Sequence, residues 1–224
     1  MIELNDISHR FGERRVLTGV NLVLGERRVG IIGSNGSGKS TLARLLNGLV
    51  LPSAGRVLVD GLDTSTDARA VRRKVGFVFQ DPDLQIVCPT VEEDIAFGLK
   101  NQKLARHEIA PRVEAALARF GLMAHRHQPA HLLSGGEKQL LALAAVLVMT
   151  PAYVVFDEPT TLLDLRNRRR IAEVIAALPE TAIVVSHDLD LVASFERVIV
   201  LDEGRVVADD APCRALRAYL ARLA

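Results

Sequence analysis

A glycine-rich segment carries the clearest chemical signal in this chain. Residues 33–41 read GSNGSGKST, in which Gly33 is followed after four residues by Gly38, Lys39 and Ser40. Glycines adopt backbone angles closed to other residues, so successive N–H groups can turn toward one anion. The lysine can neutralise the β- and γ-phosphates of a nucleotide, and the serine hydroxyl can ligate Mg²⁺. The segment is therefore predicted to hold a nucleoside triphosphate.

The flanking stretches place this loop between a strand and a helix. Residues 28–32 form a short apolar run typical of a buried strand, and after the loop four leucines at 42, 45, 46 and 49 share one helical face. The N-terminus of such a helix adds the positive end of its dipole to the anion site. The predicted nucleotide contacts are Ser34, Asn35, Gly36, Ser37, Gly38, Lys39, Ser40 and Thr41.

Two carboxylates follow a second apolar run. Residues 152–156 predict a buried strand, and Asp157 and Glu158 come at its C-terminal end. In a sheet that already carries a phosphate loop, this pair suggests one acid for Mg²⁺ and one for the water that attacks the γ-phosphate. The alternative is that both acids only cap the next helix.

Other polar residues end apolar strands or open helices. Gln80 ends the run 75–79 and His187 follows the run 182–186, at strand ends where open α/β sheets place ligand-facing side chains. Ser134, Gly135 and Gly136 open a helical pattern, so they form a second predicted anion site. For His187, position alone leaves a catalytic and a structural role open.

Two surface features have alternative interpretations. Phe11 lies in polar surroundings and either stacks on a nucleotide base or packs at a sheet edge. Thr90 and Glu93 form a capping box, which predicts a helix from near Val91 to near Gly98. The acids in its first turn suit the helix dipole, but they could also contact a basic partner.

Composition bounds the class of protein. The chain has 224 residues, enough for one α/β domain, and its formal net charge of +1 argues against binding of nucleic acid through bulk electrostatics. The longest apolar run, residues 140–149, is too short to cross a bilayer, and the N-terminal residues lack a secretory signal, so a cytoplasmic location is expected.

The element order predicts an α/β fold. Residues 2–24 alternate as antiparallel strands, and later apolar strands alternate with helices as in a mostly parallel sheet. Two helices after residue 84, the second ending at Phe120 before Gly121, are expected to form a subdomain inserted into the sheet.

Taken in chain order, these motifs resemble the full set of an ABC-type ATPase. They are Phe11, residues 33–41, Gln80, residues 133–137, residues 154–158, Asp164 and His187. The resemblance covers essentially the whole chain and implies a P-loop NTPase fold in a single domain, residues 1–224. That domain would have a RecA-like core, an N-terminal antiparallel β subdomain and a helical subdomain at about 84–150.

The resemblance also implies a role for each site residue in one subunit. Phe11 would stack on adenine, Lys39 and Ser40 would hold phosphates and Mg²⁺, and Gln80 would sense both. The remaining roles concern the chemistry of hydrolysis: Asp157 would support the metal, Glu158 would polarise water, and His187 would contact the γ-phosphate.

The family further implies that ATP is bound between two subunits, of identical or related chains. Ser134, Gly135 and Gly136 of one chain, with Asp164, would complete the site on the loop of the other. This chain departs from the family at residues 162–163, where two leucines stand in place of the usual small residue, and at Glu137, where glutamine is commoner.

Within the family, residues 81–85 and 90–98 look like the ATPase of energy-coupling factor transporters, which take up vitamins, cobalt or nickel. This implies a multi-spanning coupling subunit that docks on that region, a substrate-binding membrane subunit, and a peripheral location at the cytoplasmic face of the inner membrane, with membrane contact through partners only. The chain is similar to the minimal form found in biotin uptake, so biotin is the first expectation for the solute. The alternative is a soluble assembly ATPase that does not dock on a membrane.

Overall fold

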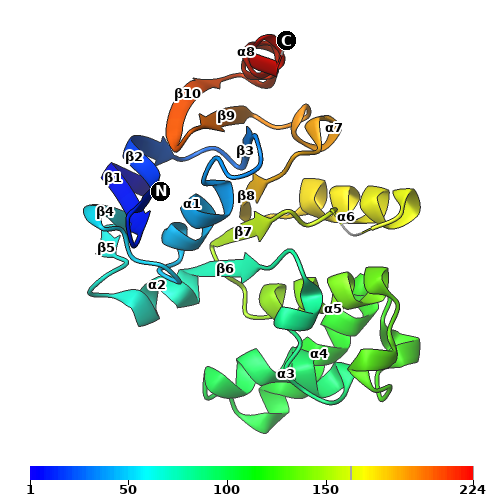
Figure 1. Ribbon diagram of the computed structural model, residues 1–224. Helices are drawn as coiled ribbons and strands as arrows, with labels where there is room; N and C mark the ends of the chain where they lie inside the picture. Colours follow the sequence, from blue (N-terminus) through cyan, green and yellow to red (C-terminus); the bar gives the residue numbers. More distant parts are fainter. Residues whose placement is uncertain (162, 224) are drawn as a thin grey trace. The chain divides into compact units, whose positions relative to one another are not determined.

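The computed structural model describes residues 1–161 and 163–223. The chain divides into two compact units (Figure 1). The first comprises Met1–Phe77, Ala152–Glu158 and the residues from Leu178 onward, and the second comprises Val78–Pro151 and Pro159–Ala177. The predicted α/β architecture of a P-loop NTPase with an antiparallel and a mainly parallel sheet is confirmed.

The first unit contains an antiparallel sheet in the order β2-β1-β4-β5. Buried residues alternate with more exposed ones along β1, at Ile2 and Leu4 and, after a register shift, at Ile7 and His9, as in a sheet with one face on the core. The strands are β1 (Ile2–Phe11), β2 (Arg14–Leu24), β4 (Ala54–Val59) and β5 (Leu62–Asp63).

A second sheet of this unit has the order β10-β9-β3-β8-β7-β6. Its central strands pair in parallel and are buried on both faces, which explains their continuous apolar sequences. The strands are β3 (Arg28–Gly33), β6 (Val75–Val78), β7 (Tyr153–Asp157), β8 (Thr181–Val185), β9 (Arg197–Asp202) and β10 (Arg205–Asp210).

Four helices of the first unit are described, and α1 packs against strands β3, β7 and β8 as well as β4. Leu42, Leu45 and Leu46 of α1 are fully buried. The helices are α1 (Lys39–Leu46), α2 (Ala68–Lys74), α7 (Leu189–Val192) and α8 (Pro212–Leu223).

The second unit is helical. Thr90 caps α3 at the predicted position, since its side chain accepts a hydrogen bond from Glu93 N–H, and its hydroxyl, rather than its N–H, contacts the Glu93 carboxylate; Gly121 ends the next helix with a φ of 67°. Helices α3, α4 and α5 contact one another. The elements are η1 (Pro82–Leu84), α3 (Val91–Asn101), α4 (Arg106–Phe120), η2 (Met123–His125), η3 (Ala130–Leu132), α5 (Gly135–Leu147) and α6 (Leu165–Ala177).

Three sequence predictions about element ends were wrong. Helix α3 continues to Asn101, past the predicted end near Gly98, because Gly98 is a close-packing position against Met149 and not a helix stop. Helix α1 ends at Leu46, so Leu49 lies beyond it and is exposed, because the chain turns at Gly48 with a φ of 68°. Strand β6 ends at Val78, which leaves Gln80 in the following loop and not at the strand end. The expectation for residues 162–163 cannot be followed in full, because Leu162 lies outside the described residues.

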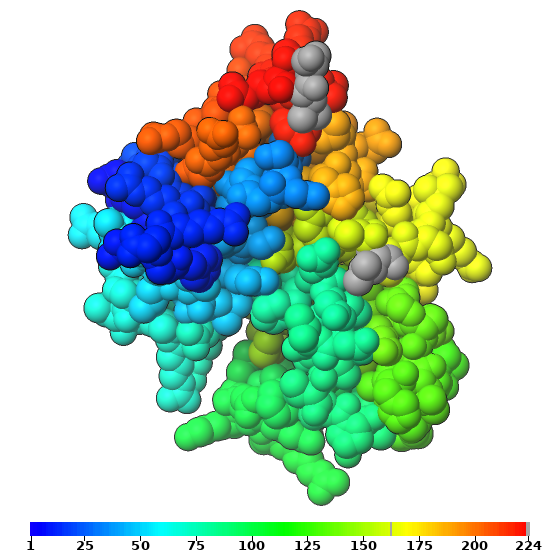
Figure 2. Space-filling model, in the orientation of Figure 1, coloured from blue at the N-terminus to red at the C-terminus, as the bar shows by residue number. Residues whose placement is uncertain are grey.

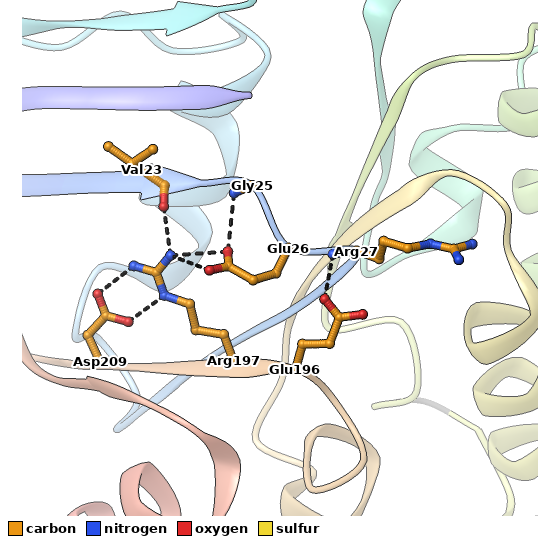
Figure 3. Close-up of polar contacts among 7 residues, drawn as sticks. All are labelled: Val23, Gly25, Glu26, Arg27, Glu196, Arg197 and Asp209. Atoms are coloured by element: carbon orange, nitrogen blue, oxygen red, sulfur yellow. Dashed lines mark hydrogen bonds and ion pairs between the residues drawn. The ribbon is translucent and has the colours of Figure 1, made fainter.

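An arginine cluster ties the two sheets of the first unit together (Figure 3). Arg197, at the start of β9, donates from Nε and Nη2 to the two carboxylate oxygens of Asp209 at 2.6 Å each. Its Nη1 donates to Val23 O of β2 at 2.7 Å and to both carboxylate oxygens of Glu26 at 3.1 Å. The planar guanidinium thus joins the end of β2 to the β9–β10 edge, with its side chain only 18% exposed.

We expect Arg197→Ala to lower the free energy of unfolding by about 2–4 kcal/mol, because two carboxylates and a carbonyl lose their shared donor. Arg222→Ala is the matched control, since Arg222 pairs with the single carboxylate of Asp202 and its side chain is 51% exposed. That control should cost less than about 1 kcal/mol. Urea denaturation of both variants measures the difference, and equal losses would contradict the role assigned to the cluster.

Candidate functional site

The glycine-rich loop begins at the C-terminal end of β3 and runs into α1. Within it, the Lys39 ammonium donates to Gly33 O at 2.9 Å and to Ser34 O at 2.8 Å. Lys39 is only 6% exposed, and burial lowers its pKa while the charges of Glu158 and Asp157 raise it. The loop therefore holds a positive charge at its centre through its own carbonyl groups, as a phosphate cradle requires.

Glycine is required where the loop leaves the sheet. Gly33 has a φ of 154°, and a Cβ there would lie 2.0 Å from Leu201 O and 2.8 Å from Ser37 Oγ. Any side chain would collide with the backbone of β9, which cannot yield as a side chain can. The loop is thus packed directly against the neighbouring strand.

Asp157, the last residue of β7, meets the first turn of α1. Its Oδ1 accepts a hydrogen bond from Ser40 Oγ at 2.7 Å, and Arg44 Nη2 lies 3.7 Å from Oδ2. Burial raises the pKa of Asp157, whereas the Ser40 hydroxyl and Arg44 lower it. A hydroxyl and a carboxylate that meet in this way supply the oxygen ligands that Mg²⁺ prefers, so these two residues fit the ion.

Glu158 follows immediately and contacts His187. Glu158 Oε2 lies 2.7 Å from His187 Nδ1 and accepts a 3.3 Å hydrogen bond from His187 N–H. Glu158 has a φ of 54°, an uncommon value for a residue with a side chain, and is 8% exposed. Its N–H donates to Val185 O of β8 at 2.9 Å, which anchors the strained residue to the sheet.

Phe11 ends β1 and is 55% exposed. Its ring packs edge-on against that of His9, with centroids 4.6 Å apart. Its strand partner Arg14 approaches the loop, since Arg14 Nη2 lies 3.8 Å from where a Cβ on Gly36 would be. An exposed ring on the strand pair that borders the loop agrees with a base-stacking role, and this role stays a prediction.

The second unit carries the remaining predicted residues. Gln80 is exposed in the loop after β6. Gln85 ties this loop to α5, because its amide accepts from Phe79 N–H at 3.2 Å and donates to Ala142 O at 2.9 Å. Ser134 is the N-cap of α5 and accepts from Glu137 N–H, as a Ser-to-Glu capping box should.

Asp164 lies next to the start of α5. Its Oδ1 accepts from Asn167 N–H at 2.8 Å and its Oδ2 from Asn167 Nδ2 at 3.1 Å, so it has the contacts of a helix cap for α6. The Asn167 amide occupies the space beside Gly136, where a Cβ would lie 2.4 Å from Asn167 Cγ. Packing against Asn167 therefore requires glycine at position 136, independently of whether a ligand binds there.

Sequence reasoning missed three of these contributors. Arg44 stands four residues after Ser40 on α1, a spacing that places both on one face and could have been noticed. The contacts of Arg14 with Gly36 and of Asn167 with Gly136 join residues distant in sequence, so they had no local signal. Within each unit, the structure groups the residues that the motifs singled out: the loop with Asp157, Glu158 and His187 in one, and Ser134–Gly136 with Asp164 in the other.

A strand, a phosphate loop, a helix and two carboxylates at one sheet edge define a P-loop nucleoside triphosphatase. The family model described as "ABC transporter" matches residues 17–161. The chain therefore belongs to the ABC transporter family, and it is an ATP-binding, ATP-hydrolysing subunit of that family.

Individual relatives indicate which branch of the ABC transporter family this chain is similar to. The biotin transport ATP-binding protein BioM of Rhizobium etli is 50% identical over 97% of both chains. The energy-coupling factor transporter ATP-binding protein EcfA1 of Symbiobacterium thermophilum is 50% identical over 86% of this chain and 70% of its own. The structure of CbiO1 from Clostridium perfringens, part of the ABC transporter complex CbiONQ, matches with a TM-score of 0.86, 34% identity, and coverage of 99% and 93%. The resemblance to energy-coupling factor ATPases is thereby confirmed.

We expect Lys39→Ala to weaken ATP binding by about 100-fold or more, because the only buried cation of the loop is lost where the phosphates would lie. Titration calorimetry measures the affinity, and Lys103→Ala, which removes an exposed lysine of the second unit, serves as the control. Wild-type ATP affinity in a folded Lys39→Ala variant would contradict the phosphate role.

Proposed function

We propose that this chain is the motor subunit of an energy-coupling factor importer, in which ATP hydrolysis drives uptake of a micronutrient. The observation that carries the chemistry is the convergence of Lys39, Ser40, Asp157 and Glu158 at one sheet edge. Lys39 and the loop N–H groups bind the phosphates of ATP, and Phe11 stacks on the adenine. Catalysis then consists of positioning and charge stabilisation.

The two neighbouring acids have different tasks in this proposal: Asp157 would bind the metal ion, and Glu158 would act on the attacking water. Ser40 and Asp157 would hold Mg²⁺, whose charge would offset that of the phosphates, and by resemblance to the family Gln80 would sense the ion and the γ-phosphate. Glu158 takes up the proton of the attacking water, and His187, hydrogen-bonded to Glu158, contacts the γ-phosphate. The two carboxylates are suited to different tasks because Asp157 faces Ser40 and Arg44, whereas Glu158 faces an imidazole.

A second ATPase subunit completes the site. In this proposal the loop of one chain and the Ser134–Gly136 helix start of the other hold the same triphosphate. Two observations support it: α5 begins with a serine and two glycines, and Asp164 and Asn167 brace that start from one side. ATP would thus join the two subunits, and hydrolysis would release them.

Residues 81–98 form the surface proposed to dock on the membrane partner. Figure 2 shows this turquoise segment at the surface of its unit, where Leu84, Val87 and Phe97 are 72%, 64% and 46% exposed. Exposed apolar side chains gathered on one segment are typical of a protein–protein contact. Every helix among residues 1–161 and 163–223 is too short or too polar to span a bilayer, so a membrane partner must supply the spans in this proposal.

The acids of α3 contribute less to docking than their sequence suggested. Glu92 pairs with the guanidinium of Arg126 at 2.8 Å, and Glu93 accepts from Thr90 Oγ1 at 2.7 Å. Asp94 is buried and accepts from the N–H groups of Val87 and Cys88. All three acids therefore have structural partners, and the apolar residues are the better candidates for the contact with coupling helices.

Biotin is the first proposal for the solute, because the Rhizobium etli relative is a biotin transport protein and matches this chain nearly end to end. Cobalt, nickel or another vitamin is the second, because the cobalt import ATP-binding protein CbiO of Syntrophus aciditrophicus is 44% identical over 95% of this chain. A soluble scaffold ATPase finds less support, since the relatives named for a role are transport proteins. The chain would lie peripherally at the cytoplasmic face of the membrane through its partners.

We expect Glu158→Gln to retain ATP binding but to lower hydrolysis by about 100- to 1000-fold, because an amide cannot accept the proton of water. With ATP, this variant should accumulate as a dimer in gel filtration. Glu114→Gln, an exposed acid-to-amide change on α4, is the control and should hydrolyse ATP like the wild type. Normal turnover in Glu158→Gln would refute the assignment.

The proposed docking surface can be tested by changing its apolar residues, which should weaken binding of the membrane partner. The double variant Leu84→Asp, Val87→Asp should recover about tenfold less of a multi-spanning partner from detergent extracts, because charge replaces apolar contact area. Met123→Asp, which alters an exposed apolar residue of η2 outside the segment, should recover it normally. If the double variant also recovers it normally, or if no membrane partner co-purifies with the wild type, the docking proposal is wrong.

A further inference from the structure

The donors at the start of α5 are already in use within the chain. Ser134 Oγ donates to Glu137 Oε2 at 2.7 Å, and Ser134 N–H donates to the same oxygen at 2.8 Å. The serine oxygen in turn accepts from Glu137 N–H at 3.4 Å. One carboxylate of the same subunit therefore occupies both donors of Ser134, the residue proposed to contact the partner subunit's nucleotide.

Glu137 is itself held in place. Its Oε1 lies 3.2 Å from His125 Nε2, and the other ring nitrogen of His125 contacts Gln128 Oε1 at 2.7 Å. The Ser134 hydroxyl and N–H lower the pKa of Glu137, against the effect of burial, with further help from His125 and Arg170. The carboxylate therefore stays ionised at neutral pH.

We propose that Glu137 sets the affinity of the nucleotide-bound dimer by competing with the triphosphate for Ser134. The inference rests on the proposed function, in which Ser134 of one subunit completes the ATP site of its partner. It goes beyond that function because it assigns to Glu137 the control of how readily the two subunits close.

The physical reason is that Ser134 has a single hydroxyl hydrogen. It can donate to the carboxylate or to a phosphate oxygen, but not fully to both, so closure must break a charge-assisted hydrogen bond. The anionic carboxylate also repels the anionic phosphate. Glutamine at position 137 would keep the helix cap, because its amide oxygen accepts from Ser134 N–H, yet it would remove the negative charge.

The test compares dimer formation in chains that cannot hydrolyse ATP. Glu137→Gln is introduced into the Glu158→Gln chain, and sedimentation velocity over a range of protein concentrations with saturating ATP and Mg²⁺ measures the dimer dissociation constant. We expect that constant to fall about tenfold or more, since a two-fold dimer contains each Glu137 contact twice. Kinetically, the single variant Glu137→Gln should reach half-maximal turnover at a lower protein concentration.

Two matched variants test whether the effect requires removal of the negative charge at position 137 itself. Glu173→Gln removes another carboxylate that lines the same hollow of ≈ 840 Å³ as Ser134 and Glu137, and it should leave the dissociation constant unchanged. Glu137→Asp keeps the charge and should not tighten the dimer. The inference would be overturned if Glu173→Gln or Glu137→Asp lowered the dimer dissociation constant as much as Glu137→Gln does.

The remaining outcomes distinguish the inference from the function on which it rests. If the Glu158→Gln chain dimerises with ATP and Glu137→Gln has no effect or weakens the dimer, the competition at Ser134 is refuted while the proposed function stands. If the Glu158→Gln chain forms no ATP-dependent dimer, the two-subunit site fails, and the inference fails with it. Melting temperatures of all variants check that each change leaves the fold intact.

Discussion

The site depends on ionised side chains that are kept out of water. Lys39, Asp157 and Glu158 are at most 8% exposed, although charges are costly to bury without partners. Burial lowers the pKa of Lys39 and raises that of Asp157, so both charged forms are held at a cost in the free chain. Backbone carbonyls, Ser40 and the neighbouring charges offset part of this cost. In the proposed function, a nucleotide with its metal ion would add further partners to those that these charges already have.

The parallel pairing of three strands brings these residues to one edge. Val185 of β8 is the register partner of Ile31 on one side and of Asp157 on the other. Beyond the strand ends the same pattern continues, because Ser186 N–H donates to Ile31 O at 3.1 Å and Glu158 N–H to Val185 O at 2.9 Å. The acids, the histidine after β8 and the phosphate loop therefore follow from a register in which β3, β8 and β7 end together.

Local patterns were enough to predict local structure. The helix start at Thr90 and the helix stop at Gly121 were predicted from spacing alone, because each depends on residues within one helical turn. The end of β6 and the end of α1 were not, since strand length and helix exit depend on neighbours distant in sequence. Side-chain contacts such as the hydrogen bond between Ser40 and Asp157 could not be predicted either, because these residues are 117 positions apart in the sequence. Their proposed shared task, Mg²⁺ binding, was predicted from the phosphate loop and from the acids at a strand end, whereas their direct hydrogen bond was not.

The two parts of the chain that are proposed to contact ATP, the phosphate loop and the start of α5, differ in whether their hydrogen-bond donors are already occupied by a carboxylate. The loop of the first unit presents a buried cation whose hydrogen bonds go to neutral carbonyl oxygens, so a phosphate would improve its surroundings. The start of α5 presents a serine whose donors are satisfied by a carboxylate, so a phosphate must first displace it. In the proposed dimer this difference orders the events. ATP binds first to the loop of one subunit, and closure onto the helix start of the other follows as a second, less favourable step. A membrane partner can influence that second step without altering the affinity for ATP itself.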